Sequence, residues 1–174
     1  HFRAAKDDYD LFLGRLHEIK GYRWAIEGAK RTRHRLLLAG GWRPSLSRYV
    51  KYVGQVGGEK KAALLAGAAC LWMPALWDEP FGLTLIEALV SGTPVLGTHR
   101  GALPEILSRD VAAMGDSVDE LVSLRSRMDS IDPVACRARV ERHFTHHTMA
   151  AGYVRMFRHF LAEGVLPTGE RAPA

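Results

Sequence analysis

The sequence predicts an α/β protein built on a doubly wound parallel sheet of about six strands. Short apolar runs alternate along the chain with segments of helical periodicity, which is typical of parallel strands that helices cover on both faces. Right-handed crossovers between such strands favour a doubly wound sheet, whose ligands lie beyond the carboxyl ends of the strands. The 174 residues, 47% of them hydrophobic, suffice to bury one core.

The elements are expected in the following chain order. Apolar runs bounded by turn residues predict strands at 10–13, 35–39, 52–54, 70–74, 94–97 and 112–114. Helical spacing of apolar residues predicts helices at 21–31, 59–66, 83–90, 102–107, 118–129, 133–143 and 148–162. Thr145 is the expected N-cap of the last helix. We therefore expect one domain over 1–163 and a flexible tail over 164–174.

Charge and cysteine content narrow the class of protein. The net charge is +5, but the basic residues are spread among acidic ones without interleaved aromatic residues, so we expect no nucleic-acid partner. Cys70 and Cys136 stand in an apolar run and in a helical stretch, which favours reduced thiols in the cytosol. The chain contains no run of eighteen apolar residues and no visible secretory signal.

These observations favour a cytoplasmic location. Peripheral association of the full protein with the inner membrane face stays open, because a moderately basic surface suits an anionic substrate or an acidic membrane equally. The excess of Arg over Lys is typical of GC-rich coding and favours a bacterial source.

The most informative stretch, residues 77–89, joins the expected strand 70–74 to a helix. Gly82 permits a close backbone approach at the turn. The backbone N–H groups at the helix start are expected to point outward and, with the helix dipole, to hold a phosphate. These groups belong to Phe81, Gly82, Leu83 and Thr84. Glu79 and Glu87 flank the turn, and each carboxylate can accept two hydroxyl hydrogen bonds from a sugar or ribose ring. By composition alone, an ordinary strand–turn–helix corner with solvent-facing acids explains the stretch equally well.

The chain is similar to the C-terminal domain of family 4 glycosyltransferases, retaining enzymes with two facing Rossmann-like domains in the GT-B fold. Their hallmark is a Glu, seven residues and a second Glu, present here as EPFGLTLIE from Glu79 to Glu87. The similarity extends from LFLGRLHEIKG (11–21) through SGTPVLGTHRGALPEIL (91–107) to Phe144-Thr145. It implies a Rossmann-like fold and a nucleotide-sugar donor. It also implies that the unknown acceptor is bound mainly by an N-terminal domain absent from this chain.

The resemblance also implies roles for individual residues. In the turn that Gly14 opens after the first strand, Arg15 and Lys20 are implied to clamp the donor diphosphate, Arg with a planar fork and Lys as a point charge. The backbone of Val56 is implied to meet the nucleobase. Uridine is the favoured base, and donors with guanosine or adenosine stay open.

The remaining implied roles belong to the two glutamates. Glu79 is implied to bind hydroxyls of the donor sugar, and Glu87 those of the ribose. Cleavage of the anomeric C–O bond leaves negative charge on the diphosphate, which positioned hydrogen-bond donors stabilise. Arg15, Lys20 and Glu79 are therefore the candidate catalytic residues, and we expect neither a cofactor nor a metal ion.

Two other functions stay open, namely a sugar-nucleotide epimerase of the same architecture and a non-catalytic nucleotide-sugar-binding module. His143, His146 and His147 resemble a metal cluster, but a helix that starts after Thr145 would separate His143 from His147, so we expect no metal site there. The four tryptophans are expected to pack rather than to form a sugar-stacking platform; they are Trp24, Trp42, Trp72 and Trp77.

Overall fold

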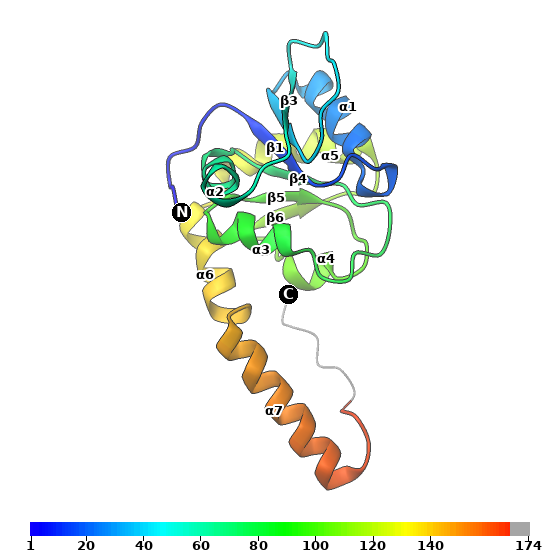
Figure 1. Ribbon diagram of the computed structural model, residues 1–174, viewed down its shortest axis with the longest axis vertical. Coiled ribbons are helices and arrows are strands. Elements are labelled where there is room, and N and C mark those ends of the chain that lie inside the picture. Colours follow the sequence, from blue (N-terminus) through cyan, green and yellow to red (C-terminus); the bar gives the residue numbers. More distant parts are fainter. Residues whose placement is uncertain (168–174) are drawn as a thin grey trace.

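The computed structural model describes residues 1–167 and contains a parallel sheet of six strands (Figure 1). The strands are β1 (Asp10–Leu13), β2 (Leu36–Ala39), β3 (Val50–Gly54), β4 (Leu71–Met73), β5 (Val95–Gly97) and β6 (Ala112–Met114). They lie in the order β3-β2-β1-β4-β5-β6, and every neighbouring pair is parallel. The chain thus winds outward from β1 on one side and from β4 on the other, which confirms the doubly wound sheet. Its switch point lies between β1 and β4.

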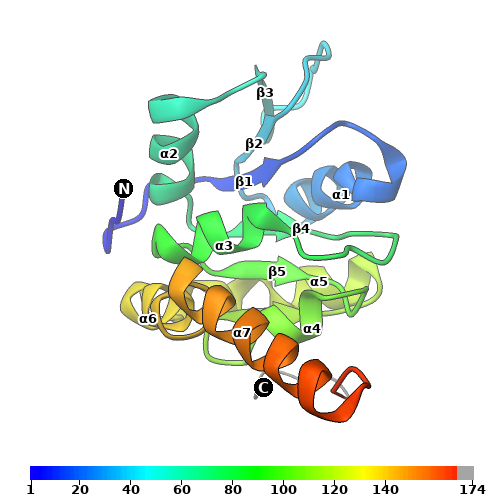
Figure 2. The ribbon, with the colours of Figure 1, turned by 60° about the horizontal axis from the view of Figure 1, so that its bottom comes forward.

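Helices cover both faces of this sheet (Figure 2). One face packs against α1 (Tyr22–Thr32) and α5 (Val118–Leu124). The other packs against α2 (Gly58–Gly67), α3 (Leu83–Val90), α4 (Leu103–Ile106) and α6 (Pro133–His143). A short 3₁₀ helix, η1 (Glu18–Lys20), precedes α1.

The side chains of the strands alternate between two hydrophobic cores, as the two-residue period of a strand requires. In β1, Leu11 belongs to the core under α2, α3 and α6, whereas Phe12 belongs to the core under α1 and α5. In β4, Leu71 and Trp72 are divided in the same way. Because both faces are covered, the strands consist of nearly uninterrupted apolar residues, and this is the pattern that predicted them.

One predicted helix, 118–129, is wrong in its second half. The α-helix α5 ends at Leu124, and a 3₁₀ helix, η2 (Arg125–Ser130), follows. The guanidinium of Arg125 is buried and donates to both carboxylate oxygens of Asp10, from Nε at 2.7 Å and from Nη2 at 2.6 Å. Trp72 Nε1 donates to the same carboxylate at 2.8 Å. This buried pairing accompanies the change to 3₁₀ geometry, which sequence spacing alone does not reveal.

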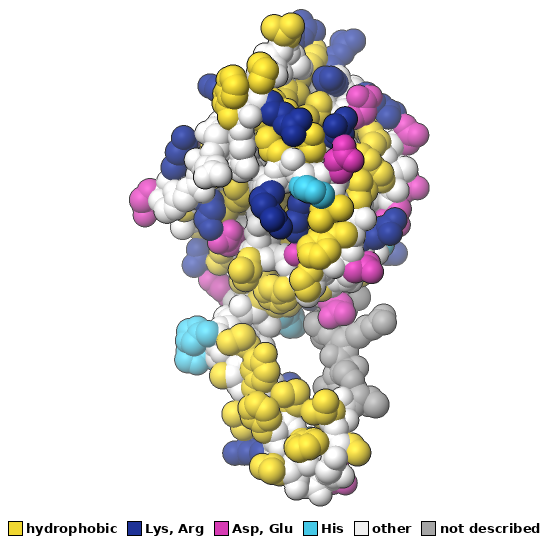
Figure 3. Space-filling view, turned by 45° about the vertical axis from the view of Figure 1, so that its right-hand side comes forward, with side chains coloured by type: hydrophobic (Ala, Val, Ile, Leu, Met, Phe, Trp, Pro, Cys, Tyr) yellow, Lys and Arg dark blue, Asp and Glu magenta, His cyan; other side chains and the backbone are white. Residues whose placement is uncertain are grey.

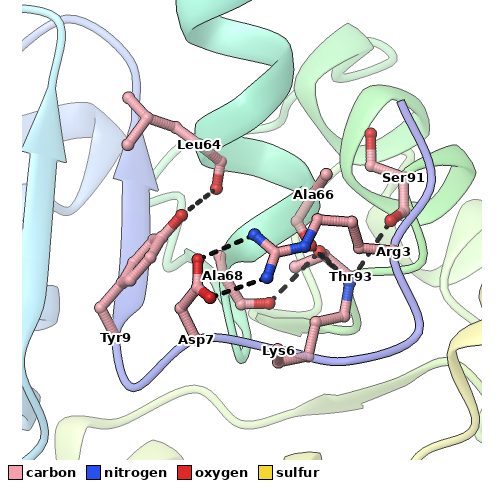
Figure 4. A network of polar contacts seen from close by, with 9 residues as sticks. All are labelled: Arg3, Lys6, Asp7, Tyr9, Leu64, Ala66, Ala68, Ser91 and Thr93. Carbon is pink, nitrogen blue, oxygen red and sulfur yellow. Dashed lines mark hydrogen bonds and ion pairs between the residues drawn. The ribbon is translucent and has the colours of Figure 1, made fainter.

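The segment before β1 runs along the carboxyl-terminal ends of α2 and α3 (Figure 4). Lys6 Nζ donates to the carbonyl oxygens of Ala66 at 2.9 Å and Ser91 at 3.3 Å, and to Thr93 Oγ1 at 3.0 Å. The hydroxyl of Tyr9 donates to the Leu64 carbonyl at 2.9 Å. A cation thus lies at the negative ends of two helices, where helix dipoles favour it.

The last helix, α7 (His146–Glu163), leaves the sheet-bearing part of the molecule (Figures 1 and 2). Thr145 is its N-cap, and the Thr145 hydroxyl accepts a hydrogen bond from Thr148 N–H at 3.1 Å, which confirms the predicted cap. No residue of α7 is buried. Of the tail expected at 164–174, residues 168–174 lie outside the described part of the chain. No helix within 1–167 is both long and apolar enough to cross a membrane.

Candidate functional site

The loops that follow β1 and β4 meet at the switch point of the sheet. Ile19 accepts a hydrogen bond at its carbonyl from Leu76 N–H at 2.8 Å. Gly21 has a φ of 71°, and a Cβ at this position would lie 1.7 Å from the carbonyl oxygen of Pro74. Only glycine therefore allows the two loops to approach so closely. Their contact fixes Lys20 next to Glu79, although the two residues stand far apart in the sequence.

Glu79 is 7% exposed and is bound by two hydrogen-bond donors. Lys20 Nζ lies 2.6 Å from its Oε2, and Trp77 Nε1 donates to the same oxygen at 3.1 Å. The Lys20 ammonium also lies 4.5 Å from the centroid of the Trp77 ring. Within residues 1–167 no group bonds to the other oxygen, Oε1. Glu79 is thus held in one orientation with an acceptor available for a ligand.

The start of α3 has the geometry that the sequence predicts. Gly82 is the N-cap with a φ of 83°, and no side chain caps this end. The first N–H group of this turn with a backbone acceptor is that of Leu85, which donates to the Gly82 carbonyl at 2.8 Å. The preceding N–H groups lie at the positive end of the helix dipole, where an anion is favoured. Phe81 and Leu83 are 42% and 71% exposed, so neither residue belongs to the hydrophobic core.

Two adjoining hollows lie at this edge of the sheet. The smaller, about 90 Å³, is lined by Lys20, Glu79 and the residues Gly82, Leu83 and Thr84 of the helix start. The larger, about 330 Å³, extends toward the ends of β2 and β3. Leu13, Gly14 and Thr84 line both hollows, which therefore form one continuous groove. Figure 3 shows Lys and Arg side chains gathered on this side of the molecule.

The larger hollow contains most of the remaining predicted residues. Arg15, Gln55, Val56 and Glu87 line it, and Arg15 is exposed. The structure thus brings the predicted residues together along one edge, with the Lys20–Glu79 pair at one end and Val56 at the other. Phe81 is the exception, since it lines neither hollow.

Lys61, on α2, is a residue of this groove that the sequence interpretation missed. Its Nζ lies 2.5 Å from Oε1 of Glu87, and both side chains are about a third exposed. No described residue bonds to the other oxygen of Glu87. The two glutamates are therefore equivalent in one respect, since each has one oxygen bound to a lysine and the other available. Its position could have been noticed in the sequence, because Lys61 stands five residues after Val56 and in the first turns of the helix that follows.

Several contacts brace the groove from outside. The Glu79 carbonyl accepts a hydrogen bond from Ala102 N–H at 2.8 Å, which ties the loop after β5 to the loop after β4. The ring of Phe81 meets the ring of Phe144 edge to face, with centroids 6.3 Å apart. Phe144 directly precedes the cap of α7, so the loop of the candidate site contacts the segment that starts the last helix.

The expected packing role holds for some tryptophans only. Trp72 is fully buried, but Trp42 is 71% exposed, so the packing prediction is wrong for Trp42. Trp77 lines neither hollow of the groove, but its Nε1 donates a hydrogen bond to Glu79. His143 ends α6 and His147 lies in the first turn of α7, which confirms that a helix boundary separates them.

Cys70 and Cys136 are buried and unpaired, as predicted. Burial raises the pKa of the Cys136 thiol to about 12, and it raises the pKa of Cys70 well above its usual value.

Comparison with known proteins shows the family to which the chain belongs. Residues 8–125 match the family model described as glycosyl transferases group 1. The chain is 28% identical over 132 residues to a phosphatidyl-myo-inositol mannosyltransferase of Mycobacterium leprae, an alignment that covers 68% of this chain and 34% of that protein. It is 26% identical over 165 residues to an uncharacterised 41.2 kDa protein of the cps region of Klebsiella pneumoniae, covering 86% of this chain and 46% of that protein.

Solved structures agree with this match. The crystal structure of AviGT4, a glycosyltransferase involved in avilamycin A biosynthesis, superposes with a TM-score of 0.78 at 32% identity, over 93% of this chain and 55% of AviGT4. Anabaena Alr3699/HepE in complex with UDP-glucose shares the fold, with a TM-score of 0.70 at 16% identity over 87% of this chain and 49% of that one. The chain spans about half the length, or less, of the proteins it matches.

Proposed function

Because this chain belongs to the group 1 glycosyl transferases, we propose that it is the donor-binding half of a retaining glycosyltransferase. The donor is a nucleotide-diphosphate sugar, and an N-terminal half of the full protein binds most of the acceptor. The observation that carries the proposal is the continuous groove at the switch point, with a lysine-held glutamate in each of its two hollows.

In the proposed complex the nucleotide-sugar lies along the groove, with its sugar at the Lys20–Glu79 end and its base at the Val56 end. The diphosphate lies at the start of α3, where backbone N–H groups, Arg15 and Lys20 converge on negative charge. Glu79 then accepts hydrogen bonds from hydroxyls of the sugar, and Glu87 accepts hydrogen bonds from hydroxyls of the ribose. Val56 meets the base at the far end of the larger hollow. UDP is the favoured nucleotide, and the UDP-glucose complex of HepE, which has the same fold, supports this choice.

The chemistry assigned to these residues is electrostatic. When the anomeric C–O bond breaks, charge develops on the departing diphosphate, and the cations and helix start stabilise it without having to reorganise. Glu79 is already oriented by Lys20 and Trp77, so its interaction with the sugar costs little further ordering. Glu79 acts by binding hydroxyls, not as a covalent nucleophile.

One experiment on the full two-domain protein distinguishes the roles of Glu79 and Glu87. A ribose contact acts alike on the nucleotide and the nucleotide-sugar, so Glu87→Ala should weaken the binding of UDP and of the UDP-sugar equally. A contact that tightens as the sugar ring flattens acts on the transition state, so Glu79→Ala should spare UDP affinity and lower kcat. Calorimetry and a transfer assay measure the two effects. Unchanged turnover in Glu79→Ala would contradict the catalytic role.

Product analysis distinguishes this function from the two alternatives. A glycoside product supports the transferase, an epimerised donor indicates the epimerase, and binding without turnover indicates a silent module.

The cations and the helix start supply all the positive charge that the proposal needs, so nucleotide binding should not require a metal. We expect calorimetric titration with UDP to give the same affinity in excess EDTA and in added Mg²⁺. Loss of binding in EDTA would overturn the metal-free mechanism while leaving the donor site in place.

A further inference from the structure

A second hollow lies away from the donor groove, at the opposite edge of the sheet. It has a volume of about 600 Å³ and opens between α6 and the segment that joins α4 to β6. That segment contributes Ser108 and Asp110, just before the amino end of β6. α6 contributes Arg139, Arg142 and His143. None of these residues lines the donor groove.

Arg139 forms the fixed wall of this hollow. Its residue surface is 8% exposed, and its guanidinium donates to the carbonyl oxygens of Ile106 at 3.2 Å and Glu105 at 2.9 Å. These carbonyls belong to the end of α4, where a cation is favoured. The bonds tie α6 to α4 and hold a positive charge at a constant position in the wall.

Arg142 and His143 add charge at the same place. Arg142 is exposed, and His143 is half-buried in the last turn of α6. Burial, Arg139 and Arg142 together lower the pKa of His143, and burial lowers the pKa of Arg139. The basic side chains of Arg139, Arg142 and His143 line the hollow with one carboxylate, that of Asp110, so the hollow favours an anion.

Ser108 provides an independent sign of a ligand. Ser108 is 7% exposed. Within residues 1–167, its hydroxyl is the one buried polar side-chain atom that has no hydrogen-bond partner. Such a group costs about 1–3 kcal/mol unless a partner reaches it. Cations in the last turn of a helix can be explained by the helix dipole alone, but an unpartnered buried hydroxyl beside them cannot.

We propose that this hollow is a second anion-binding site, which takes a phosphate group. Arg142 offers a planar guanidinium whose donors match phosphate oxygens, and Arg139 contributes its fixed positive charge. His143 offers a ring N–H, and Ser108 offers its hydroxyl. The group is a free phosphate or phosphorylated metabolite, or the phosphate of an anionic lipid headgroup. The site is distinct from the donor groove and does not depend on the function proposed above.

The test uses inorganic phosphate and the full-length protein with Arg15→Ala, so that phosphate bound in the donor groove contributes little. We expect calorimetry to show saturable binding of phosphate. We also expect NMR titration to show a rise in the pKa of His143, because phosphate neutralises the surrounding positive charge. Arg142→Glu should weaken binding at least tenfold, and Ser108→Ala should weaken it several-fold. Arg155→Glu, on the exposed face of α7, is the matched control for the change in net charge and should have no effect.

Vesicles distinguish the two sources of the phosphate. Phosphatidylcholine vesicles with and without phosphatidic acid are sedimented with the protein and with the Arg142→Glu and Arg155→Glu variants. Binding to the acidic vesicles that only Arg142→Glu abolishes assigns the site to a lipid headgroup. Binding of phosphate without such vesicle binding assigns it to a soluble ligand. The proposal is overturned if phosphate does not bind saturably, or if Arg142→Glu and Arg155→Glu weaken binding equally.

Discussion

At the scale of residues, the proposed function depends on two lysine–glutamate pairs. Lys20 binds one carboxylate oxygen of Glu79, and Lys61 binds one of Glu87. A glutamate held in this way keeps its orientation and its charge balance while its second oxygen can accept a hydroxyl. Arg15, in contrast, is exposed, and no described residue forms an ion pair with it. It can therefore reach a diphosphate without first breaking a contact.

This difference leads to a prediction for the two cations of the first loop. Arg15→Ala and Lys20→Ala should each weaken UDP about ten- to a hundredfold, because charge-assisted hydrogen bonds are worth roughly 1.5–3 kcal/mol. The loss should be greater for Lys20→Ala, which also leaves the carboxylate of Glu79 unneutralised near the phosphates. Calorimetric titration with UDP and with uridine gives the comparison, and uridine affinity should hardly change. Equal losses for the two ligands would show that these cations do not bind the diphosphate.

At the scale of elements, the approach of two loops positions the groove. The loop after β1 and the loop after β4 leave the sheet side by side, since β1 and β4 are neighbours at the switch point. Gly21 lets them close onto each other, and the hydrogen bond between Leu76 and Ile19 holds them. η1, which ends at Lys20, then places this ammonium over Glu79.

A substitution at this contact should therefore damage both stability and function. Gly21→Ala should lower the free energy of unfolding by about 1–3 kcal/mol, because its φ of 71° strains any other residue and its Cβ would overlap the Pro74 carbonyl. It should also weaken UDP binding by displacing Lys20. Gly152→Ala on α7 is the control, since a Cβ there meets no atom within 4 Å, and it should not destabilise the protein. Urea unfolding measures both variants. An unchanged midpoint for Gly21→Ala would refute the close approach of the loops.

At the scale of the whole molecule, the sheet with its covering helices contrasts with the projecting α7. Apolar side chains follow one another along α7 at helical spacing and stay largely exposed (Figure 3). They are Met149, Tyr153, Val154, Phe157, Phe160 and Leu161. A contiguous apolar surface of this kind is rare on an isolated soluble protein. We therefore expect this apolar surface of α7 to be accessible to a hydrophobic probe.

We expect the 174-residue chain to bind the dye anilinonaphthalene sulfonate through this helix. The double variant Tyr153→Lys with Phe157→Lys should remove most of the dye fluorescence, because it divides the apolar surface with two charges. Trp42→Lys is a matched control, since Trp42 is also exposed but lies outside α7. Fluorescence titration measures the effect, and equal fluorescence in the double variant and the control would place the binding surface elsewhere.

The amino-acid sequence determined the elements and the motif of this protein. Strands 10–13 and 112–114 and helices 83–90 and 133–143 are found at the predicted residues. Apart from the wrong second half of helix 118–129, the other boundaries shift by one or two residues. β3, for example, starts at Val50 rather than at residue 52, because exposed Lys51 in this edge strand interrupts the apolar run. Such patterns are local, since the period of apolar residues along one element follows directly from which of its faces is buried.

The tertiary structure decided which distant side chains meet. The pairing of Lys61 with Glu87, and of Arg125 with Asp10, depends on the order of the strands and on how helices from different parts of the chain pack together. The same holds for Ser108, whose lack of a partner becomes visible only when α6 is in place beside it. Sequence spacing cannot reveal these contacts, because partners that are 26 or 115 residues apart are brought together by packing rather than by any local period.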